Sequence, residues 1–294
     1  MSLVTRVLST LVVASATAFG ACGGEDVPLA VGGDKPTPTE TESGGEDDGE
    51  EGIFPKLDIF GATSIDWFLH FPPSQGPNEF WEMMHIDLWT GKASYVCFIS
   101  GTQDEPWPTS STFTRDDRLM VSNGYSLWEI SLPDCVGTHI ATYPEAHGII
   151  NGIAPDAGYG LLGVSASGGE LVAIDPDTGV VTPIGDFGFP LSGSHGATWV
   201  EAEQELYIVE GSTDALYIAD QLTGAATWIS GIQYDFEWVG FEHHPHTGEM
   251  YGCSSDAEVF LISADGSVDH LTQLELPCNN LAAPWDVPEL PPIG

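Results

Sequence analysis

The sequence has very little positive charge. Its 294 residues include 6 Lys and Arg against 44 Asp and Glu, a formal net charge of −38. So few basic side chains exclude a nucleic-acid binder that neutralises phosphates, and they argue against docking on anionic lipid. Long helices are also disfavoured, because the chain has 35 Gly and 21 Pro. Apolar residues still make up 42% of the chain, so we expect a sizeable folded core.

The N-terminal segment predicts export. Arg6 precedes an apolar run, Val7 to Phe19, that is shorter than the roughly 20 residues of a membrane-spanning helix and fits a signal peptide. Residues 19–22 (Phe-Gly-Ala-Cys) resemble the lipobox of bacterial lipoproteins. The resemblance implies a signal peptide over 1–21 and a palmitate-type lipid on Cys22, which would anchor the protein in the cell envelope, at the outer membrane or cell surface. The alternative is ordinary cleavage after Ala21 and a secreted protein.

A linker is expected after the anchor. Residues 22–52 are rich in Gly, Pro, Thr and acidic residues, with Lys35 as the only base. Such a segment has almost nothing to bury and repels itself, so we expect it to be disordered. No second apolar stretch of spanning length follows, so we expect membrane contact only through the lipid. Residues 53–294 then form the folded domain.

Internal repetition is the strongest signal in that domain. The clearest copies are residues 170–184 and 215–229, each with two apolar stretches around an Asp-x-x-Thr-Gly turn. Weaker copies cover residues 84–99, 127–143 and 259–274. The equivalent polar residues lie 44, 44, 45 and 43 positions apart in the series Asp87, Ser131, Asp175, Asp220 and Ser263. A period near 44 with four short strands per copy predicts the blades of a β-propeller.

The repeat arithmetic predicts five blades. The stretch 53–294 holds five periods of 44 with about half a period left over. The first repeat begins at its second strand, within residues 65–71, and residues 278–283 look like the start of a sixth copy. We therefore predict an all-β, five-bladed β-propeller in which the C-terminal stretch supplies the innermost strand of blade one and closes the ring.

These copies resemble the YVTN-type and related PQQ-like propeller repeats of secreted bacterial proteins. The resemblance covers residues 65–283 and rests on the turns Asp175 to Gly179 and Asp220 to Gly224. It implies a propeller fold but no particular chemistry, because propellers carry many unrelated functions. The YVTN tetrapeptide itself is absent.

Four cysteines remain for disulfides in an exported protein. Cys97 is expected in the outer strand of blade one and Cys135 in a turn of blade two, whereas Cys253 and Cys278 bracket blade five. We predict the pairs 97–135 and 253–278, the second of which would fix the closing strand. The alternative is four buried thiols.

The cluster of histidines at 243, 244 and 246 lies where blade five should turn from its first to its second strand. We interpret it as a turn with exposed polar side chains. Occasional Zn²⁺ or Cu²⁺ binding is the alternative.

Ligands of propellers commonly meet the loops around the central axis. A ring of side chains precedes the inner strands there, and two tryptophans in the same loops could stack on a sugar or another planar ligand. The candidate ligand-binding residues are Asn151, His195, Trp238, Asn279 and Trp107. We therefore predict a non-catalytic, monomeric module for a protein or glycan ligand, with no cofactor.

Two other functions remain open. A glycosidase or lyase would need a pair of loop carboxylates, for which Glu145, Asp186 and Glu237 are candidates. A calcium-dependent adhesin would use the plentiful carboxylates to hold Ca²⁺, although no EF-hand loop is present and metal ligands cannot be assigned. The sequence also lacks a nucleophile elbow, a phosphate loop and a metalloprotease helix.

Overall fold

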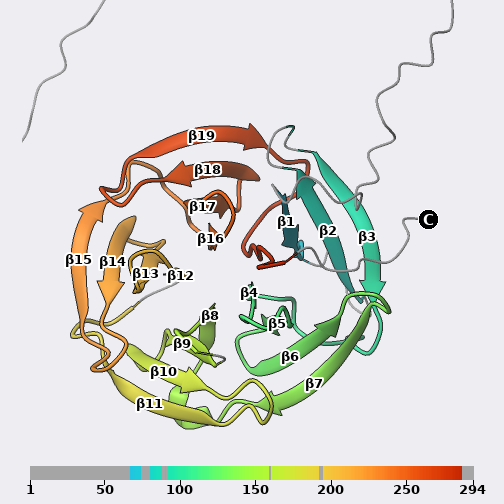
Figure 1. The fold of residues 1–294 in the computed structure, drawn as a ribbon, viewed down its shortest axis with the longest axis horizontal. Helices are drawn as coiled ribbons and strands as arrows, with labels where there is room; N and C mark the ends of the chain where they lie inside the picture. Colours follow the sequence, from blue (N-terminus) through green and yellow to red (C-terminus); the bar gives the residue numbers. More distant parts are fainter. Residues whose placement is uncertain are drawn as a thin grey trace, which may run out of the picture. The chain divides into compact units, whose positions relative to one another are not determined.

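The computed structural model describes residues 67–73, 80–87, 90, 92–158, 160–191 and 195–286. These residues form five antiparallel sheets arranged around one axis, which confirms the predicted all-β, five-bladed propeller (Figure 1). The predicted signal peptide, Cys22 and the acidic linker lie outside the described residues. Within the described part, no helix is long and apolar enough to span a membrane.

The strands follow one another outward in every blade. Blade 1 contains β1 (Trp67–His70), β2 (Trp81–Asp87) and β3 (Ala93–Ile99). Blade 2 contains β4 (Ser110–Phe113), β5 (Leu119–Ser122), β6 (Ser126–Ser131) and β7 (Val136–Thr142), and the short helix η1 (Glu145–His147) follows it. Blade 3 contains β8 (Ile150–Pro155), β9 (Leu161–Ser165), β10 (Glu170–Ile174) and β11 (Val181–Asp186). Blade 4 contains β12 (His195–Val200), β13 (Glu205–Glu210), β14 (Ala215–Ala219) and β15 (Ala226–Gly231). Blade 5 contains β16 (Val239–His244), β17 (Glu249–Ser254), β18 (Glu258–Ile262) and β19 (Val268–Gln273).

The predicted repeat has a further structural signature. In all five blades the pairing between the third strand and the outermost strand contains a register shift. These irregularities follow the residues Met83, Leu127, Leu171, Leu216 and Val259. A bulge increases the local twist of a strand, which suits the strongly twisted outer edge of a blade.

The hydrophobic core lies between blades. The described residues form five buried clusters, one at each interface between neighbouring blades. The cluster between blades 5 and 1 contains Phe68 and Ile86 of blade 1, Tyr251 and Val259 of blade 5, and Leu281 of the closing segment. Because each blade is covered on both faces, its third strand is apolar on both sides, as the sequence indicated.

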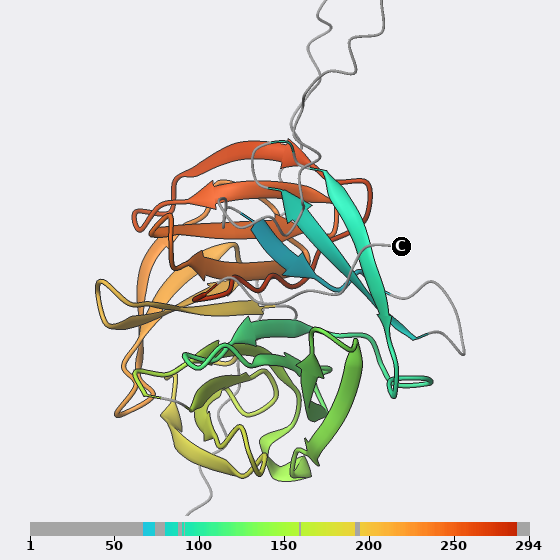
Figure 2. The same cartoon turned by 45° about the vertical axis from the view of Figure 1, so that its right-hand side comes forward.

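The C-terminal segment closes the ring as predicted. The amide of Leu69 donates to the carbonyl of Ala282 over 2.9 Å, and the amide of Ala282 donates to the carbonyl of Leu69 over 3.0 Å. Ala282 therefore pairs with β1 as the innermost strand of blade 1, and the first blade combines residues from both ends of the domain. Figures 1 and 2 show β1–β3 beside the strands of blade 5.

Small residues let the inner strands approach closely. A Cβ on Gly196 would lie 2.5 Å from the Cβ of Phe241 in the next blade. A Cβ on Gly240 would lie 2.6 Å from the backbone nitrogen of Asn280 in the closing segment. The glycines that recur every 44 residues thus mark close contact between blades at the axis.

Both predicted disulfides are present. Cys97 of β3 pairs with Cys135 in the β6–β7 turn, so this bond links blade 1 to blade 2. Cys253 of β17 pairs with Cys278, so this bond links blade 5 to the closing segment of blade 1. The two bonds therefore connect the composite blade to its two neighbours.

The histidine cluster is only partly a turn. Strand β16 continues to His244, so His243 and His244 are 6% and 0% exposed, and the expectation of exposed side chains at both positions is wrong. The His244 ring packs against Phe68 at 5.2 Å, and its Nδ1 accepts the amide of His246 over 3.3 Å. The sequence suggested a turn that begins at His243. In the structure the turn covers only residues 245–248, and the ring of His244 accepts hydrogen bonds from its backbone.

Candidate functional site

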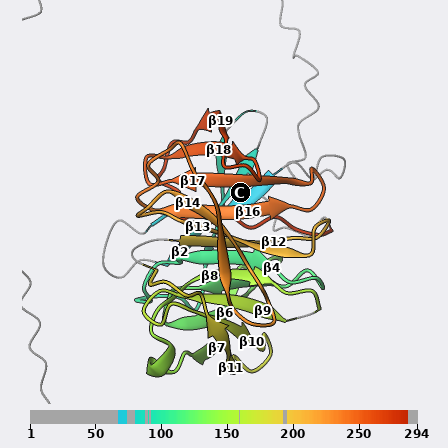
Figure 3. The ribbon, with the colours of Figure 1, turned by 90° about the vertical axis from the view of Figure 1, so that its left-hand side faces the viewer.

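The connections between antiparallel strands alternate between the two ends of the propeller axis. The loops between blades share one end with the turns between second and third strands, and we refer to this end as the loop face. Their described residues are 100–109, 143–149, 187–191, 232–238 and 274–280. The turns between first and second and between third and fourth strands form the turn face. Figure 3 shows the propeller from the side, with the strand ends gathered at these two faces.

The turn face is crossed by side chains near the axis. Arg115 in the β4–β5 turn donates from Nε to the carbonyl of Asp156 over 2.8 Å and forms an ion pair with Glu201. Its guanidinium lies 5.2 Å from the ring centre of Trp285, whose Nε1 donates to the carbonyl of Phe113. Turns of blades 2, 3 and 4 and the C-terminal tail are thus joined at this end.

A buried carboxyl lies at the centre of the ring. Glu242 of β16 is 3% exposed and accepts hydrogen bonds from the hydroxyls of Thr112 and Thr198, over 3.3 and 3.4 Å. Burial raises the pKa of Glu242 well above its ordinary value, and bonds from the Ala283 amide and the two threonines lower it only in part. The group is therefore held in its neutral form across an extended pH range.

The loop face presents two tryptophans that come from different blades. Trp107 precedes β4 and Trp238 precedes β16, yet their ring centres lie 6.1 Å apart at an interplanar angle of 31°. Trp107 is 40% exposed and Trp238 is 41% exposed. The structure thus brings together the two tryptophans that the sequence placed in equivalent loops, and we refer to them as the tryptophan pair.

Trp107 is held by a well-anchored loop. The indole of Trp81 donates to the carbonyl of Pro106 over 3.0 Å, and the amide of Asn279 donates to the carbonyl of Pro108 over 3.2 Å. The flanking prolines fix their own φ angles. Trp107 is therefore presented by a loop that is tied to blade 1 on both sides.

Trp238 projects from a turn with an unusual backbone. Glu237 has φ +45°, in the left-handed region, and the Trp238 amide donates back to the carbonyl of Phe236. Phe236 is fully buried against Phe260, and its amide donates to Asp214 over 3.1 Å. A buried aromatic thus anchors the turn that leaves the next aromatic exposed.

The other three candidate ligand residues differ in exposure. Asn151 is partly exposed, whereas Asn279 is 5% exposed and uses its amide to hold the Pro108 loop. His195 is 1% exposed, and its Nε2 lies 3.1 Å from the carbonyl of Val164. Burial lowers the pKa of His195, which favours a neutral imidazole. Asn279 therefore supports the Trp107 loop, whereas His195 is bonded to blade 3, and contact of any of the three with a ligand stays a prediction.

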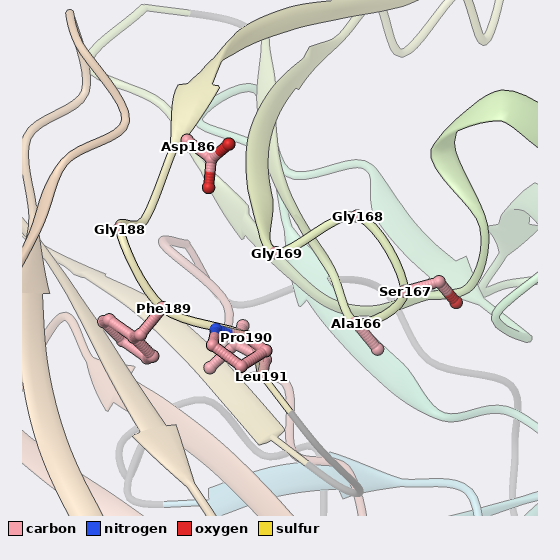
Figure 4. A pocket seen from close by; sticks show the side chains of 9 residues that line it. All are labelled: Ala166, Ser167, Gly168, Gly169, Asp186, Gly188, Phe189, Pro190 and Leu191. Atoms are coloured by element: carbon pink, nitrogen blue, oxygen red, sulfur yellow. The ribbon is translucent and has the colours of Figure 1, made fainter. Parts of the chain in front are cut away.

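A shallow pocket of about 630 Å³ lies further out on the same face (Figure 4). It is lined by the β9–β10 turn and by the loop that follows β11, including Ser167, Asp186 and Phe189. The Phe189 ring stacks on Tyr217 of blade 4 with ring centres 4.5 Å apart. The pocket is open to solvent, and three of its lining residues are glycines: Gly168, Gly169 and Gly188.

The three candidate catalytic carboxylates lie on three separate connections: Glu145 in η1, Asp186 at the end of β11 and Glu237 before β16. All three are exposed, and no hydrogen bond joins any two of them among the described residues. Within that same part of the chain, no three His, Cys, Asp or Glu side chains are grouped closely enough to hold a metal ion. Catalysis and calcium binding stay predictions.

Sequence reasoning did not identify Glu242 as a special residue. It placed residues 240–242 on an inner strand but had no signal for the hydroxyls of Thr112 and Thr198, which come from other blades. The one indication in the sequence was an acidic residue that directly follows the apolar inner-strand residues Val239 to Phe241.

Comparison with known proteins identifies the fold. No family model matches the sequence, and no curated protein matches it. A chain in the crystal structure of a nidogen/laminin complex is similar with a TM-score of 0.52 and 13% identity, over 74% of this chain and 81% of that one. A structural genomics protein of unknown function from Bacteroides thetaiotaomicron has a TM-score of 0.51 and 14% identity, over 74% of this chain and 62% of that one. Virginiamycin B lyase from Staphylococcus aureus has a TM-score of 0.44 and 12% identity, over 73% of this chain and 72% of that one. At such low identities the likeness concerns the fold alone.

Proposed function

We propose that this propeller is a non-catalytic binding module that takes its ligand, a protein or a glycan, on the loop face. The observation that carries the proposal is the tryptophan pair. Aromatic side chains dominate binding surfaces because they offer a wide contact area at a low cost in conformational entropy. Here two indoles from different blades lie side by side and remain two-fifths exposed.

The support around the pair agrees with a binding role. Trp81 and Asn279 hold the Trp107 loop, and Phe236 anchors the Trp238 turn. A surface whose geometry is fixed before binding loses less entropy when the ligand arrives. The opposite end of the axis is crossed by Arg115 and Trp285, which contact each other and the strands beside them.

The test is a binding screen of the full-length protein on glycan and peptide arrays. We expect Trp107→Ala with Trp238→Ala to weaken the binding of any ligand found by about tenfold or more. The matched control is Trp228→Ala, because Trp228 is 60% exposed but lies on the outer strand β15. Equal binding by the double variant and the wild type would overturn the proposal, and turnover of an arrayed glycan would favour the enzyme alternative.

We also propose that the module is displayed on a lipid anchor at Cys22, through the acidic linker of residues 22–52. The support is the lipobox-like sequence at 19–22 and the linker composition. Mass spectrometry of the mature N-terminus tests this: the proposal expects an acylated Cys22 and its loss in Cys22→Ala. An unmodified N-terminus would indicate a secreted protein instead.

A further inference from the structure

In the described part of the chain, the Lys and Arg side chains are confined to one end of the propeller. The basic residues in the described part of the chain are Lys92 in the β2–β3 turn and Arg115 and Arg118 in the β4–β5 turn. All three belong to the turn face. Arg118 is occupied there by a double hydrogen bond to Glu129, at 3.0 and 2.7 Å, and by Asp177 at 2.6 Å. The described residues of the loop face thus contain no Lys or Arg.

The two loops that carry the tryptophan pair share a composition. Asp104 and Glu105 come shortly before Trp107, and Asp235 and Glu237 come shortly before Trp238. None of the four carboxylates is buried, and none forms an ion pair among the described residues. Each loop therefore offers one partly exposed indole together with two carboxylates free to interact with a ligand.

On this basis we propose that the ligand of the loop face is a cationic protein segment, rich in arginine or lysine, that stacks on the tryptophan pair. The inference rests on the proposed function and assigns its ligand class. Indole faces attract guanidinium and ammonium groups, and adjacent carboxylates add a charge-assisted bond. Anionic ligands such as sulfated or uronic glycans would be repelled, because nothing on this face offsets their charge.

The experiment measures the affinity of the full-length protein for a fluorescent peptide of alternating arginine and glycine. The same peptide with citrulline in place of arginine is the probe control, because citrulline keeps the shape and loses the charge. We expect binding that weakens as salt rises, and little binding of the citrulline peptide. Trp107→Ala with Trp238→Ala should raise the Kd about tenfold, the equivalent of two modest cation–π contacts.

Because the whole chain is acidic, a cationic peptide could bind it anywhere. A pair of matched variants separates the effect of the loop-face carboxylates from the effect of net charge. One variant neutralises the four loop-face carboxylates: Asp104→Asn, Glu105→Gln, Asp235→Asn and Glu237→Gln. The control neutralises four exposed carboxylates in the third-to-fourth turns of the turn face: Asp134→Asn, Asp177→Asn, Asp220→Asn and Asp265→Asn. Both remove the same charge, but only the first should weaken binding strongly.

The outcomes separate this inference from the function it rests on. Equal losses in the two neutralised variants, or equal binding of the citrulline peptide, would overturn the cationic ligand. A neutral glycan that binds through the tryptophan pair without dependence on salt would also overturn it, while the proposed function would stand. If no probe depends on the tryptophan pair, both proposals fail.

Discussion

The side chain of Asn280 replaces a backbone partner for Phe71, which lies 209 positions earlier in the sequence. Its Oδ1 accepts the Phe71 amide over 2.9 Å, and its Nδ2 donates to the Phe71 carbonyl over 2.9 Å. Both residues are buried. The amide group thus extends the pairing between the closing segment and blade 1 beyond Leu69 and Ala282.

The first prediction concerns this contact. Asn280→Ala leaves two buried backbone groups of Phe71 without their partner, so we expect the free energy of unfolding to fall by about 2–4 kcal/mol. Urea unfolding of the variant and the wild type at neutral pH measures this difference in the free energy of unfolding. Asn279→Ala is the control. Among the described residues its side chain bonds to the Pro108 carbonyl and the Asn280 side chain and to no backbone group of blade 1, so its loss should cost less. A smaller loss for Asn280→Ala than for the control would contradict the role of Asn280 in ring closure.

The second prediction concerns the disulfides. The bond between Cys253 and Cys278 closes a loop of 25 residues, and that between Cys97 and Cys135 one of 38. Replacing either pair by alanine should lower the free energy of unfolding by about 3–4 kcal/mol, from the loop-closure entropy of the unfolded chain. Urea unfolding with and without reductant checks this, since reductant should have no further effect once both pairs are replaced. If a variant with one cysteine pair replaced by alanine is as stable as the oxidised wild type, that disulfide does not stabilise the closed ring.

The third prediction concerns Glu242. Because its folded pKa is raised, the unfolded chain loses the proton first, so rising pH through the ordinary carboxyl range favours unfolding. Glu242→Gln should match the wild type in stability below that range and exceed it at neutral pH. Urea unfolding at acidic and neutral pH measures the difference, with the exposed Glu145→Gln as control. A variant less stable than the wild type at neutral pH would argue for an ionised carboxylate at the axis.

The fourth prediction concerns His70, which is buried beneath the closing segment with its ring nitrogens 3.0 Å from the carbonyls of Asn280 and Pro277. Burial lowers the pKa of His70 to about 4, and the two carbonyls raise it only in part. Protonation therefore favours the unfolded chain, and stability should fall by roughly 3 kcal/mol as the pH drops from 6.5 toward 4. His70→Gln should flatten this part of the stability profile, whereas His246→Gln, in an exposed turn, should not. An unchanged slope in His70→Gln would assign the acid sensitivity elsewhere.

The sequence predicted the fold well because each blade of a propeller repeats the same pattern of strands and turns. The series from Asp87 to Ser263 gave the blade count, and the half repeat around Asn280 predicted the closure that the Leu69–Ala282 pairing confirms. The disulfides followed once the cysteines were assigned to blades. The boundary of β16 was less predictable, because Pro245 and Gly248 signal a turn without showing where it begins.

The candidate site was predictable only as a set of positions. Equivalent loops place Trp107 and Trp238 on one face, but periodicity does not show that their rings meet at 6.1 Å. Nor does it separate the exposed indoles from the buried His195 and Asn279, because burial depends on which blade packs over each side chain. Contacts across the axis are specific to each pair of blades, whereas the repeat describes only what the blades share.

The most direct measurement of the central claim is hydrogen–deuterium exchange of the full-length protein with and without the arginine–glycine peptide, or with the tightest ligand from the array screen. We expect slower exchange in the peptide segments that contain Trp107 and Trp238, and no change in exchange at the turn face around Arg115 and Trp285. Protection confined to the turn face or to the outer strands, with the two tryptophan loops unchanged, would contradict it.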